Sequence, residues 1–232
     1  MVRKLPNKGL ASSQTKGMLT RRAHGHKFPK PRIIIVCEGK VTEPQYFEDF
    51  TDQCANTLVR ITTIGGCGVP VSVVERAIVE KQQLTRLARS TKDSYDRQFE
   101  VWAVFDRDDH PKPQIPRALR LAQVNDIRVA FSNPCFELWG LMHFSCVARP
   151  GSHQDTQREL KRRLPGFCHE KNPILPSQEL ENRYPRAVTN ATRALKARSD
   201  EGQEHGDPST TVHLLTEKIR QFGRIQAHSS RS

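Results

Sequence analysis

The sequence has few aromatic residues, no long apolar run and no acidic residue near its start. Only 6% of the 232 residues are aromatic, so aliphatic side chains must form most of the core, for which an apolar content of 36% is sufficient. No apolar run approaches the ~20 residues of a membrane span. No apolar segment follows the basic residues Arg3, Lys4 and Lys8. We therefore expect a cytoplasmic protein with neither a membrane span nor a secretory signal.

Several motifs that define common active sites are also missing. The six cysteines include no C-x-x-C pair and no histidine pair has zinc-finger spacing, which argues against a zinc site and fits a reducing compartment. No nucleophile-elbow motif is present, so acyl transfer has no support. The glycine cluster at 65–68 lacks Walker spacing and is either a flexible turn or a weak phosphate cradle.

Positive charge is concentrated at two places in the chain. The net charge is +12, and residues 1–37 contain nine Lys/Arg and no acid. Residues 149–198 contain eleven basic and five acidic residues, whereas the centre at 38–148 is slightly acidic. This distribution suits a polyanion held at its edges, although a basic tail can also serve only solubility. Residues 1–30 show no hydrophobic periodicity, and we expect a basic arm that is disordered until bound.

Alternating strand and helix patterns predict an α/β fold. The run Ile33–Cys37 is apolar throughout, as in a strand buried on both faces. Further strands are expected at about 59–64, 99–105 and 127–131. Helices are expected at about 43–56, 70–90 and 135–144, with a short helix that ends at Leu121. Four such alternations indicate a parallel sheet covered on both faces. After Pro150 we expect only helices, at about 154–164, 185–198 and 209–223. The predicted organisation is an arm (1–30), an α/β domain (31–150) and a helical extension packed on it (151–232).

Local signals at helix boundaries suggest how the elements begin. Gly39 is expected to turn the chain with a positive φ, after which Thr42 caps a helix with Pro44 in its first turn. Asn133 is expected to cap the next buried helix, with Pro134 at its first position. In the helix at 70–90, we expect Glu75 and Glu80 to face solvent with Arg76 and Lys81.

Acidic residues follow two of the apolar strands directly. Asp106 and Asp108 lie two apart beyond the third strand, so both side chains point the same way if the chain stays extended. Glu38 reaches the same sheet edge if strands one and three are neighbours, as in a 2-1-3-4 order. Carboxylates gathered there suit Mg²⁺ or Mn²⁺, which can activate water for phosphodiester cleavage. The alternative is a surface loop of acids paired with Arg107 and Lys112.

Other candidate residues have more than one possible role. Glu137 is either a metal or substrate residue or an acid favoured by the start of its helix. His110 is either a base or phosphate ligand or an ordinary loop histidine. Trp139, Phe136 and His143 are expected in the core. Basic residues of two C-terminal helices could bind a phosphate backbone, and the alternative is that they form ordinary solvated helix faces. These residues are Arg158, Arg162, Arg163, Arg186 and Arg193.

Three segments, in this order and spacing, resemble the RloB-like proteins: VCEGKVTEPQYF, VFDRDDH and SNPCFELWGLMHF. The resemblance covers roughly residues 30–145, and the later GDPSTTVHLL is similar to a C-terminal element of that family. These proteins are bacterial and archaeal and are linked to restriction-modification and abortive phage-defence loci. The family looks like a divergent Toprim domain, the fold of topoisomerase, primase and OLD-nuclease centres. The resemblance implies a Toprim-like, Rossmann-like, four-stranded parallel sheet with C-terminal helical additions.

The resemblance also implies roles for residues of this chain. Glu38 resembles the Toprim glutamate, and Asp106 with Asp108 resembles its D-x-D motif. Glu43 resembles a further acid of OLD-type nucleases, and Asp109 is an additional acid of unassigned role. The implied function is a Mg²⁺-dependent or Mn²⁺-dependent nuclease in phage defence.

The main alternative is a non-catalytic module that binds nucleic acid or an ATPase encoded in the same locus. A topoisomerase-like enzyme would need a nucleophile among Tyr46, Tyr95 and Tyr184, and it ranks last. The sequence leaves open DNA against RNA, activity of the chain alone, the trigger, the partner and whether the protein is a homo-oligomer.

Overall fold

The computed structural model of the chain describes residues 32–63, 69–91, 95–107, 110 and 113–223, and its centre is a five-stranded sheet of order β2-β1-β3-β4-β5. The first four strands are parallel, and the last is antiparallel to β4. The strands are β1 (Arg32–Cys37), β2 (Val59–Thr63), β3 (Phe99–Asp106), β4 (Arg128–Asn133) and β5 (Ser209–Thr210). The expected α/β class is thus confirmed, and strands β1 and β3 are neighbours, which was the condition for Glu38 and Asp106 to share one sheet edge.

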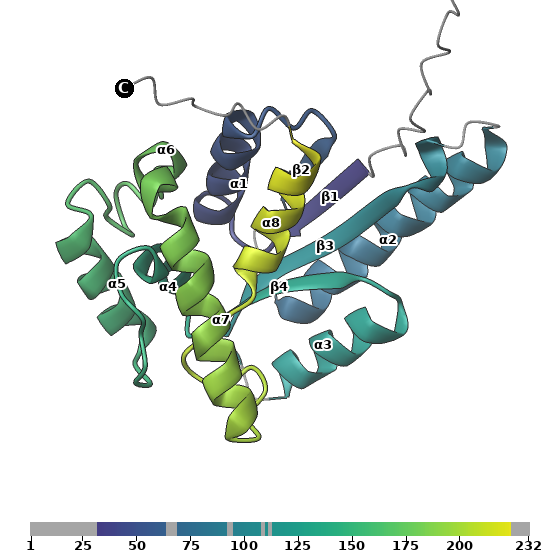
Figure 1. Cartoon of the computed structure of the whole chain (residues 1–232). Helices are drawn as coiled ribbons and strands as arrows, with labels where there is room; N and C mark the ends of the chain where they lie inside the picture. The colour runs from purple at the N-terminus through teal and green to yellow at the C-terminus, as the bar shows by residue number, and fades with distance from the viewer. Residues whose placement is uncertain (1–31, 64–68, 92–94, 108–109, 111–112, 224–232) are drawn as a thin grey trace, which may run out of the picture.

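Helices cover both faces of this sheet (Figure 1). The α-helices are α1 (Thr42–Gln53), α2 (Pro70–Ser90), α3 (Gln114–Val124), α4 (Glu137–Met142), α5 (His153–Arg163), α6 (Ser177–Leu180), α7 (Tyr184–Asp200) and α8 (Val212–Phe222). Two short 3-10 helices are η1 (Tyr95–Arg97) and η2 (Glu181–Arg183). Among the described residues, no helix has the length and apolar character needed to cross a membrane.

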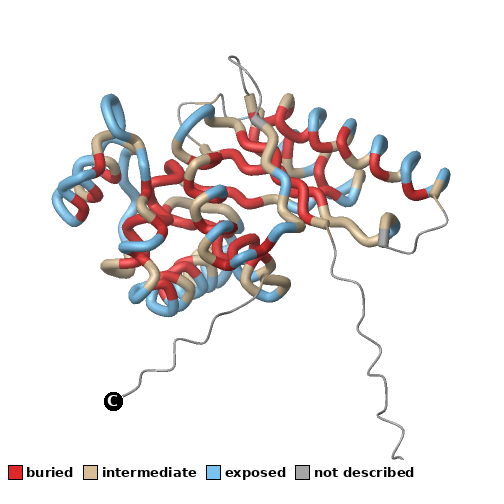
Figure 2. The backbone as a smooth tube through the Cα atoms, turned by 90° about the horizontal axis from the view of Figure 1, so that it is seen from above, coloured by how far each residue is buried: buried red, intermediate tan, exposed pale blue. Residues whose placement is uncertain are grey.

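The apolar run of β1 supplies two separate cores. Ile33 and Ile35 belong to one cluster with residues of α1, α4, α7 and α8, whereas Ile34 packs with α2 and α3 on the other face. All three side chains are fully buried. Successive side chains of a strand point to opposite faces, so an uninterrupted apolar run is what a two-sided core requires. The tube in Figure 2 shows the strands as a buried centre between more exposed helices.

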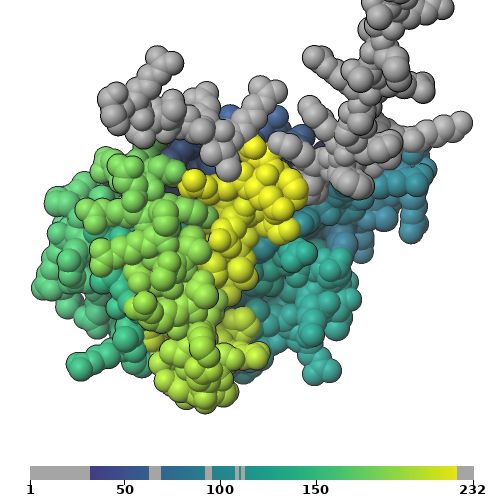
Figure 3. Space-filling view, in the orientation of Figure 1, coloured from purple at the N-terminus to yellow at the C-terminus, as the bar shows by residue number. Residues whose placement is uncertain are grey.

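The fifth strand corrects the expectation of four parallel strands and of a helix beginning at residue 209. Ser209 and Thr210 pair with Asn133 and Ser132 of β4, and the Ser132 and Thr210 hydroxyls lie 2.9 Å apart. Helix α8 begins only at Val212. Helices α7 and α8 lie over one face of the molecule, as the space-filling view shows (Figure 3). The C-terminal residues therefore contribute to the same sheet as well as covering it.

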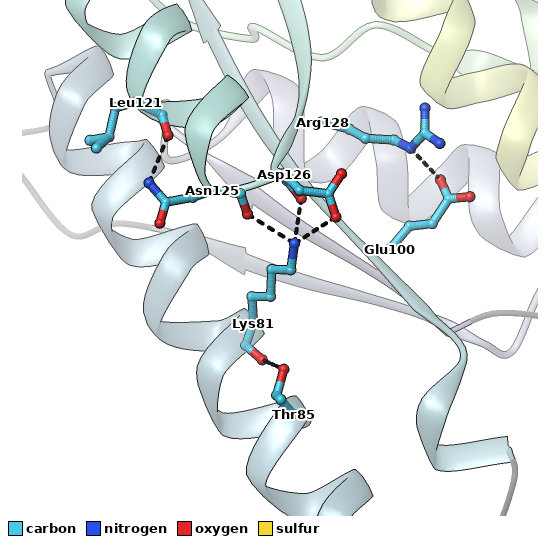
Figure 4. A network of polar contacts seen from close by, with 7 residues as sticks. All are labelled: Lys81, Thr85, Glu100, Leu121, Asn125, Asp126 and Arg128. Carbon is cyan, nitrogen blue, oxygen red and sulfur yellow. Dashed lines mark hydrogen bonds and ion pairs between the residues drawn. The ribbon is translucent and has the colours of Figure 1, made fainter.

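A network around Lys81 holds the turn from α3 to β4 (Figure 4). The Lys81 ammonium donates to the backbone carbonyls of Asn125 and Asp126, at 2.9 Å and 2.7 Å, and to the Asp126 carboxylate at 2.7 Å. Asp126 has a φ of 50°, a left-handed conformation that short polar residues tolerate. The side chain of Lys81, expected to face solvent, thus connects α2 to this turn.

Two expected helix starts differ in the structure. Thr42 lies inside α1, whose first turn does contain Pro44, and among the described residues no side chain caps that helix. Asn133 is the last residue of β4 and not a cap, and Pro134 precedes α4, whose first residue is Glu137. The Asn133 side chain instead donates to the carbonyl of His205 at 2.9 Å, because the C-terminal segment runs beside β4.

Several expectations fall outside the described residues: the basic arm at 1–30, the glycine cluster at 65–68, and Asp108 and Asp109. The division of the chain at residue 150 stays a prediction.

Candidate functional site

Two acidic residues meet at the carboxyl edge of the sheet because β1 and β3 are adjacent and parallel. Glu38 directly follows β1, and its backbone N–H donates to the Val104 carbonyl at 3.0 Å, which continues the pairing of the two strands. Asp106 is the last residue of β3. Ligand clefts of open α/β sheets form at this edge, where the strand order changes direction.

His110 joins these two carboxylates from the loop after β3. Its Nε2 lies 2.9 Å from Oε1 of Glu38. Arg107 contacts both β4 and His110: its backbone N–H donates to the Ser132 carbonyl at 2.9 Å, and its guanidinium donates to the His110 carbonyl. One ligand atom from each of Glu38, Asp106 and His110 lies within 4.8 Å of the others. Among the described residues, these three form a group that could hold a metal ion.

The Asp106 carboxylate is also fixed by the start of α4. Its Oδ2 accepts the Phe136 N–H at 3.2 Å, which couples the end of β3 to the segment after β4. Phe136 itself is buried in the core beside Trp139, as expected from the sequence. The acid is therefore oriented by the backbone before any ligand binds.

Glu43 extends the acidic group from α1. Its side chain is buried, and Oε1 accepts the Gly39 N–H at 3.3 Å. Gly39 does not have the positive φ that we expected. A Cβ atom at this position would instead lie 2.0 Å from Oε2 of Glu43, so glycine is required for the close approach of the carboxylate.

Glu137 forms a second pair of carboxylate and histidine. Its Oε1 lies 2.7 Å from Nδ1 of His169 and 3.3 Å from the Gln157 amide nitrogen that donates to it. Burial by itself raises the pKa of the Glu137 carboxyl, but hydrogen bonds from His169 and the backbone outweigh it and leave the pKa below its usual value. Glu137 is therefore a buried carboxylate that stays ionised.

All of these groups line one cleft of about 380 Å³. That volume lies within the range of small-ligand pockets, roughly 300–1,000 Å³. The cleft brings together most of the residues that the sequence singled out at this edge, together with three polar residues that it did not. The predicted ones are Glu38, Gly39, Glu43, Asp106, His110 and Glu137, and the others are Lys40, Gln157 and His169.

Other candidate residues lie away from this cleft. Asn133 does not line it, and neither do the five candidate arginines. On α5, Arg158 is paired with Asp155 at 3.0 Å, and Arg162 and Arg163 are both paired with Glu159. On α7, Arg186 and Arg193 are exposed. These side chains therefore belong to outer helix faces, and their binding of nucleic acid stays a prediction.

The sequence could have indicated one of the three polar residues that were not predicted. Lys40 directly follows Glu38-Gly39, and its position within the acidic motif could have identified it as a candidate. Gln157 and His169 come from α5 and the loop after it, and no spacing links them to the strands. Their position depends on how the C-terminal helices pack against α4.

The comparisons with known proteins give a family and no nearer relative. The family model described as RloB-like protein matches residues 33–219, which include every described residue of the cleft. The search of curated proteins and the search of solved structures each returned no match. The match extends over most of the chain and agrees with the three segments that pointed to this family. The chain belongs to the RloB-like family.

Proposed function

We propose that this protein is a metal-dependent nuclease that hydrolyses phosphodiester bonds at the cleft beside β1 and β3. The observation that carries the proposal is the placement of ligand atoms from Glu38, Asp106 and His110 within 4.8 Å of one another. Like charges gathered in a cleft favour a bound cation, and a divalent ion is the usual partner of such a group.

The chemistry of these ligands fits a small divalent ion, and their ligand atoms are close enough together for one ion to contact all three. Two carboxylates suit Mg²⁺ and Mn²⁺, and the imidazole shifts the preference toward Mn²⁺. When bound, the ion would supply positive charge to the phosphate and lower the pKa of a water molecule.

The surrounding residues have supporting roles in this proposal. Glu43 holds the turn after β1, and the exposed Lys40 at the rim of the cleft is placed to bind a neighbouring phosphate. Asp108 and Asp109 add carboxylates next to Asp106 in the sequence, by the resemblance to the D-x-D motif. The arginines of α5 and α7, with the basic arm, provide non-specific contacts to a nucleic acid backbone. A Toprim-type reaction in a cytoplasmic phage-defence system is the setting that the resemblance implies.

The rival function is a module that binds nucleic acid or a partner ATPase and cleaves nothing. The charge distribution of the chain fits this function as well. Such a module, however, does not require carboxylates and a histidine at one sheet edge. Metal-dependent cleavage therefore separates the two.

The deciding experiment uses purified full-length protein with supercoiled plasmid and with total tRNA, in Mn²⁺, Mg²⁺ or EDTA. The Asp106→Ala and Asp106→Asn proteins are compared with Asp52→Asn, which removes an exposed carboxylate from α1 outside the cleft. We expect cleavage of one substrate class in the presence of metal, loss of at least 100-fold in both Asp106 variants, and no change in Asp52→Asn. Wild-type protein that binds nucleic acid without cleaving it would favour the rival.

A further inference from the structure

The cleft contains a second histidine–carboxylate pair that the metal-ligand group does not use. Glu137 and His169 contribute to the same cleft as Glu38 and His110, yet they come from α4 and from the loop between α5 and α6. Their side chains differ sharply in environment, since Glu137 is 4% exposed and His169 is 51% exposed. The pair thus joins a buried, fixed charge to a ring that reaches solvent.

The loop that carries His169 is held in place by its backbone. Cys168 and Asn172 exchange two hydrogen bonds, of 2.9 Å and 2.7 Å, around the turn that contains His169. The Asn172 side chain donates to the Gly166 carbonyl, and Phe167 is fully buried beneath the turn. An exposed histidine on such a short, anchored turn has little freedom to move away from the cleft.

Glu137 and Gln157 orient the ring of His169. The Glu137 carboxylate and the Gln157 amide nitrogen lie 2.7 Å and 3.1 Å from Nδ1, so the other ring nitrogen, Nε2, is the one turned away from both. A carboxylate on one imidazole nitrogen fixes the ring and stabilises its protonated form, which is the arrangement used for proton transfer at the other nitrogen. Glu137 lies directly after Phe136, whose N–H binds Asp106, so this pair is tied to the metal-ligand group through one short backbone segment.

We propose that His169 is the general acid of the reaction and that Glu137 is its positioning residue. The proposal rests on the nuclease function proposed above. As water adds to phosphorus and loses a proton to solvent, the bond from phosphorus to the leaving oxygen breaks. That oxygen takes its proton from Nε2 of protonated His169, and the neutral ring then regains a proton from solvent through its exposed side. Asp106, Glu38 and His110 have no part in this proton transfer.

The alternative is that His169 only neutralises a buried carboxylate. A structural role predicts that loss of His169 slows cleavage of every substrate by the same factor, because the change would act on the buried Glu137 carboxylate and the folded cleft and not on the leaving group. A general acid predicts an effect that depends on the leaving group, because a leaving group that departs as a stable anion needs no proton.

The test compares two oligonucleotides of the class that wild-type protein cleaves. One has the natural linkage, and the other has sulfur in place of the leaving oxygen at the scissile linkage, chosen from the ends of the wild-type products. We expect His169→Gln to slow cleavage of the natural linkage by about 100-fold or more and that of the sulfur linkage by only a few-fold. We also expect the wild-type rate to fall at high pH, because the reaction requires a protonated acid, and we expect this fall to be absent in His169→Gln. Glu170→Gln, on the same turn but outside the cleft, should match wild type on both substrates.

The results that would overturn the proposal are distinct. Equal slowing on both linkages assigns His169 to binding or structure, and no slowing removes it from the reaction. Wild-type protein that cleaves neither linkage in any metal refutes the nuclease function itself, before a substitution is considered. An activity-free measurement is an NMR titration of the histidine rings, assigned with His169→Gln. Glu137→Gln should lower the titration midpoint of His169, and an unmoved midpoint would contradict the role of Glu137.

Discussion

Gly39 and Glu43 are so close that no side chain fits between the backbone of one and the carboxylate of the other. A Cβ atom on residue 39 would lie 2.0 Å from Oε2 of Glu43, and the Gly39 N–H is a donor to the same carboxylate. The two residues fix the turn that begins at Glu38. The identity of residue 39 therefore controls the position of an acid four residues later.

Gly39→Ala is expected to displace the Glu43 carboxylate and weaken metal binding by about 10-fold, the usual effect of disturbing groups around a metal site. Because a carboxylate at the end of a flexible side chain can move, the free energy of unfolding should change by no more than about 1 kcal/mol. Mn²⁺ titrations followed by calorimetry measure the affinity. Gly151→Ala is the control, since a Cβ there meets nothing within 4 Å. Equal Mn²⁺ affinity in both variants would contradict the prediction.

Binding of Mn²⁺ should raise the thermal midpoint of the wild-type protein. A ligand at 100 times its Kd stabilises the folded state by about 2.7 kcal/mol. For a chain of this size such a gain corresponds to a rise of roughly 5 °C or more. Asp106→Asn and Glu38→Gln should abolish most of the rise, because each removes a charged ligand atom, while Asp52→Asn should retain it. A midpoint that is the same in Mn²⁺ and in EDTA would exclude a metal site in the wild-type protein.

Buried His143 should make the protein less stable in mild acid. Burial lowers the pKa of His143 from 6.5 to about 4, and its ring lies 3.0 Å from the Trp139 carbonyl. At pH values between about 4 and 6.5, the unfolded chain therefore binds a proton at His143 that the folded protein does not bind. Stability is fully present above pH 6.5 and declines as the pH falls to about 4, by an amount on the order of 3 kcal/mol.

Urea denaturation between pH 7.5 and 4 measures this loss, and His143→Gln should show a shallower decline than the wild-type protein. Some decline will persist, because burial also lowers the pKa values of His205 and His213. Identical slopes for His143→Gln and wild type would show that another group controls the acid sensitivity.

Glu80 of α2 forms two ion pairs, one within its own helix and one that connects the helix to the edge strand β2. The buried carboxylate binds Arg76 at 2.7 Å and also binds Arg60 of β2. Glu80→Gln should lower the free energy of unfolding by about 1–2 kcal/mol, since a neutral amide replaces a charge shared by two guanidinium groups. Glu75→Gln on the exposed face of the same helix should stay within about 0.5 kcal/mol of wild type. Chemical denaturation of both variants measures the difference, and equal stabilities would contradict a stabilising role for the pairs.

The sequence predicted the part of the fold that local patterns determine. The uninterrupted apolar run Ile33–Cys37 required a two-sided core, and Glu38 and Asp106 at the ends of two such strands predicted their meeting at one edge. Glu80 was wrongly expected to face solvent. Helical periodicity predicts which residues lie on the polar face of a helix, but it does not show that two arginines will bind the Glu80 carboxylate and bury it. Gly39 was expected to be needed for a turn with positive φ. The structure instead needs glycine there because the Glu43 side chain lies against its backbone.

The rest depended on contacts between distant parts of the chain. Asn133 has a good capping side chain, but the segment around His205 takes its hydrogen bond, and no local pattern reveals that competition. Strand β5 is only two residues long, too short for an alternating pattern. His169 enters the cleft because a turn after α5 reaches Glu137, 32 residues earlier.

Strand β5 also has a consequence for how the protein is made. Translation delivers Glu38, Asp106 and His110 well before Gln157 and His169, and the outer edge of β4 gains its partner only when Ser209 and Thr210 have emerged. Until then β4 presents an unpaired edge, a region prone to contacts with other chains. A nascent chain on the ribosome thus holds the acidic group without its complete surroundings, and the finished cleft is a late product of synthesis.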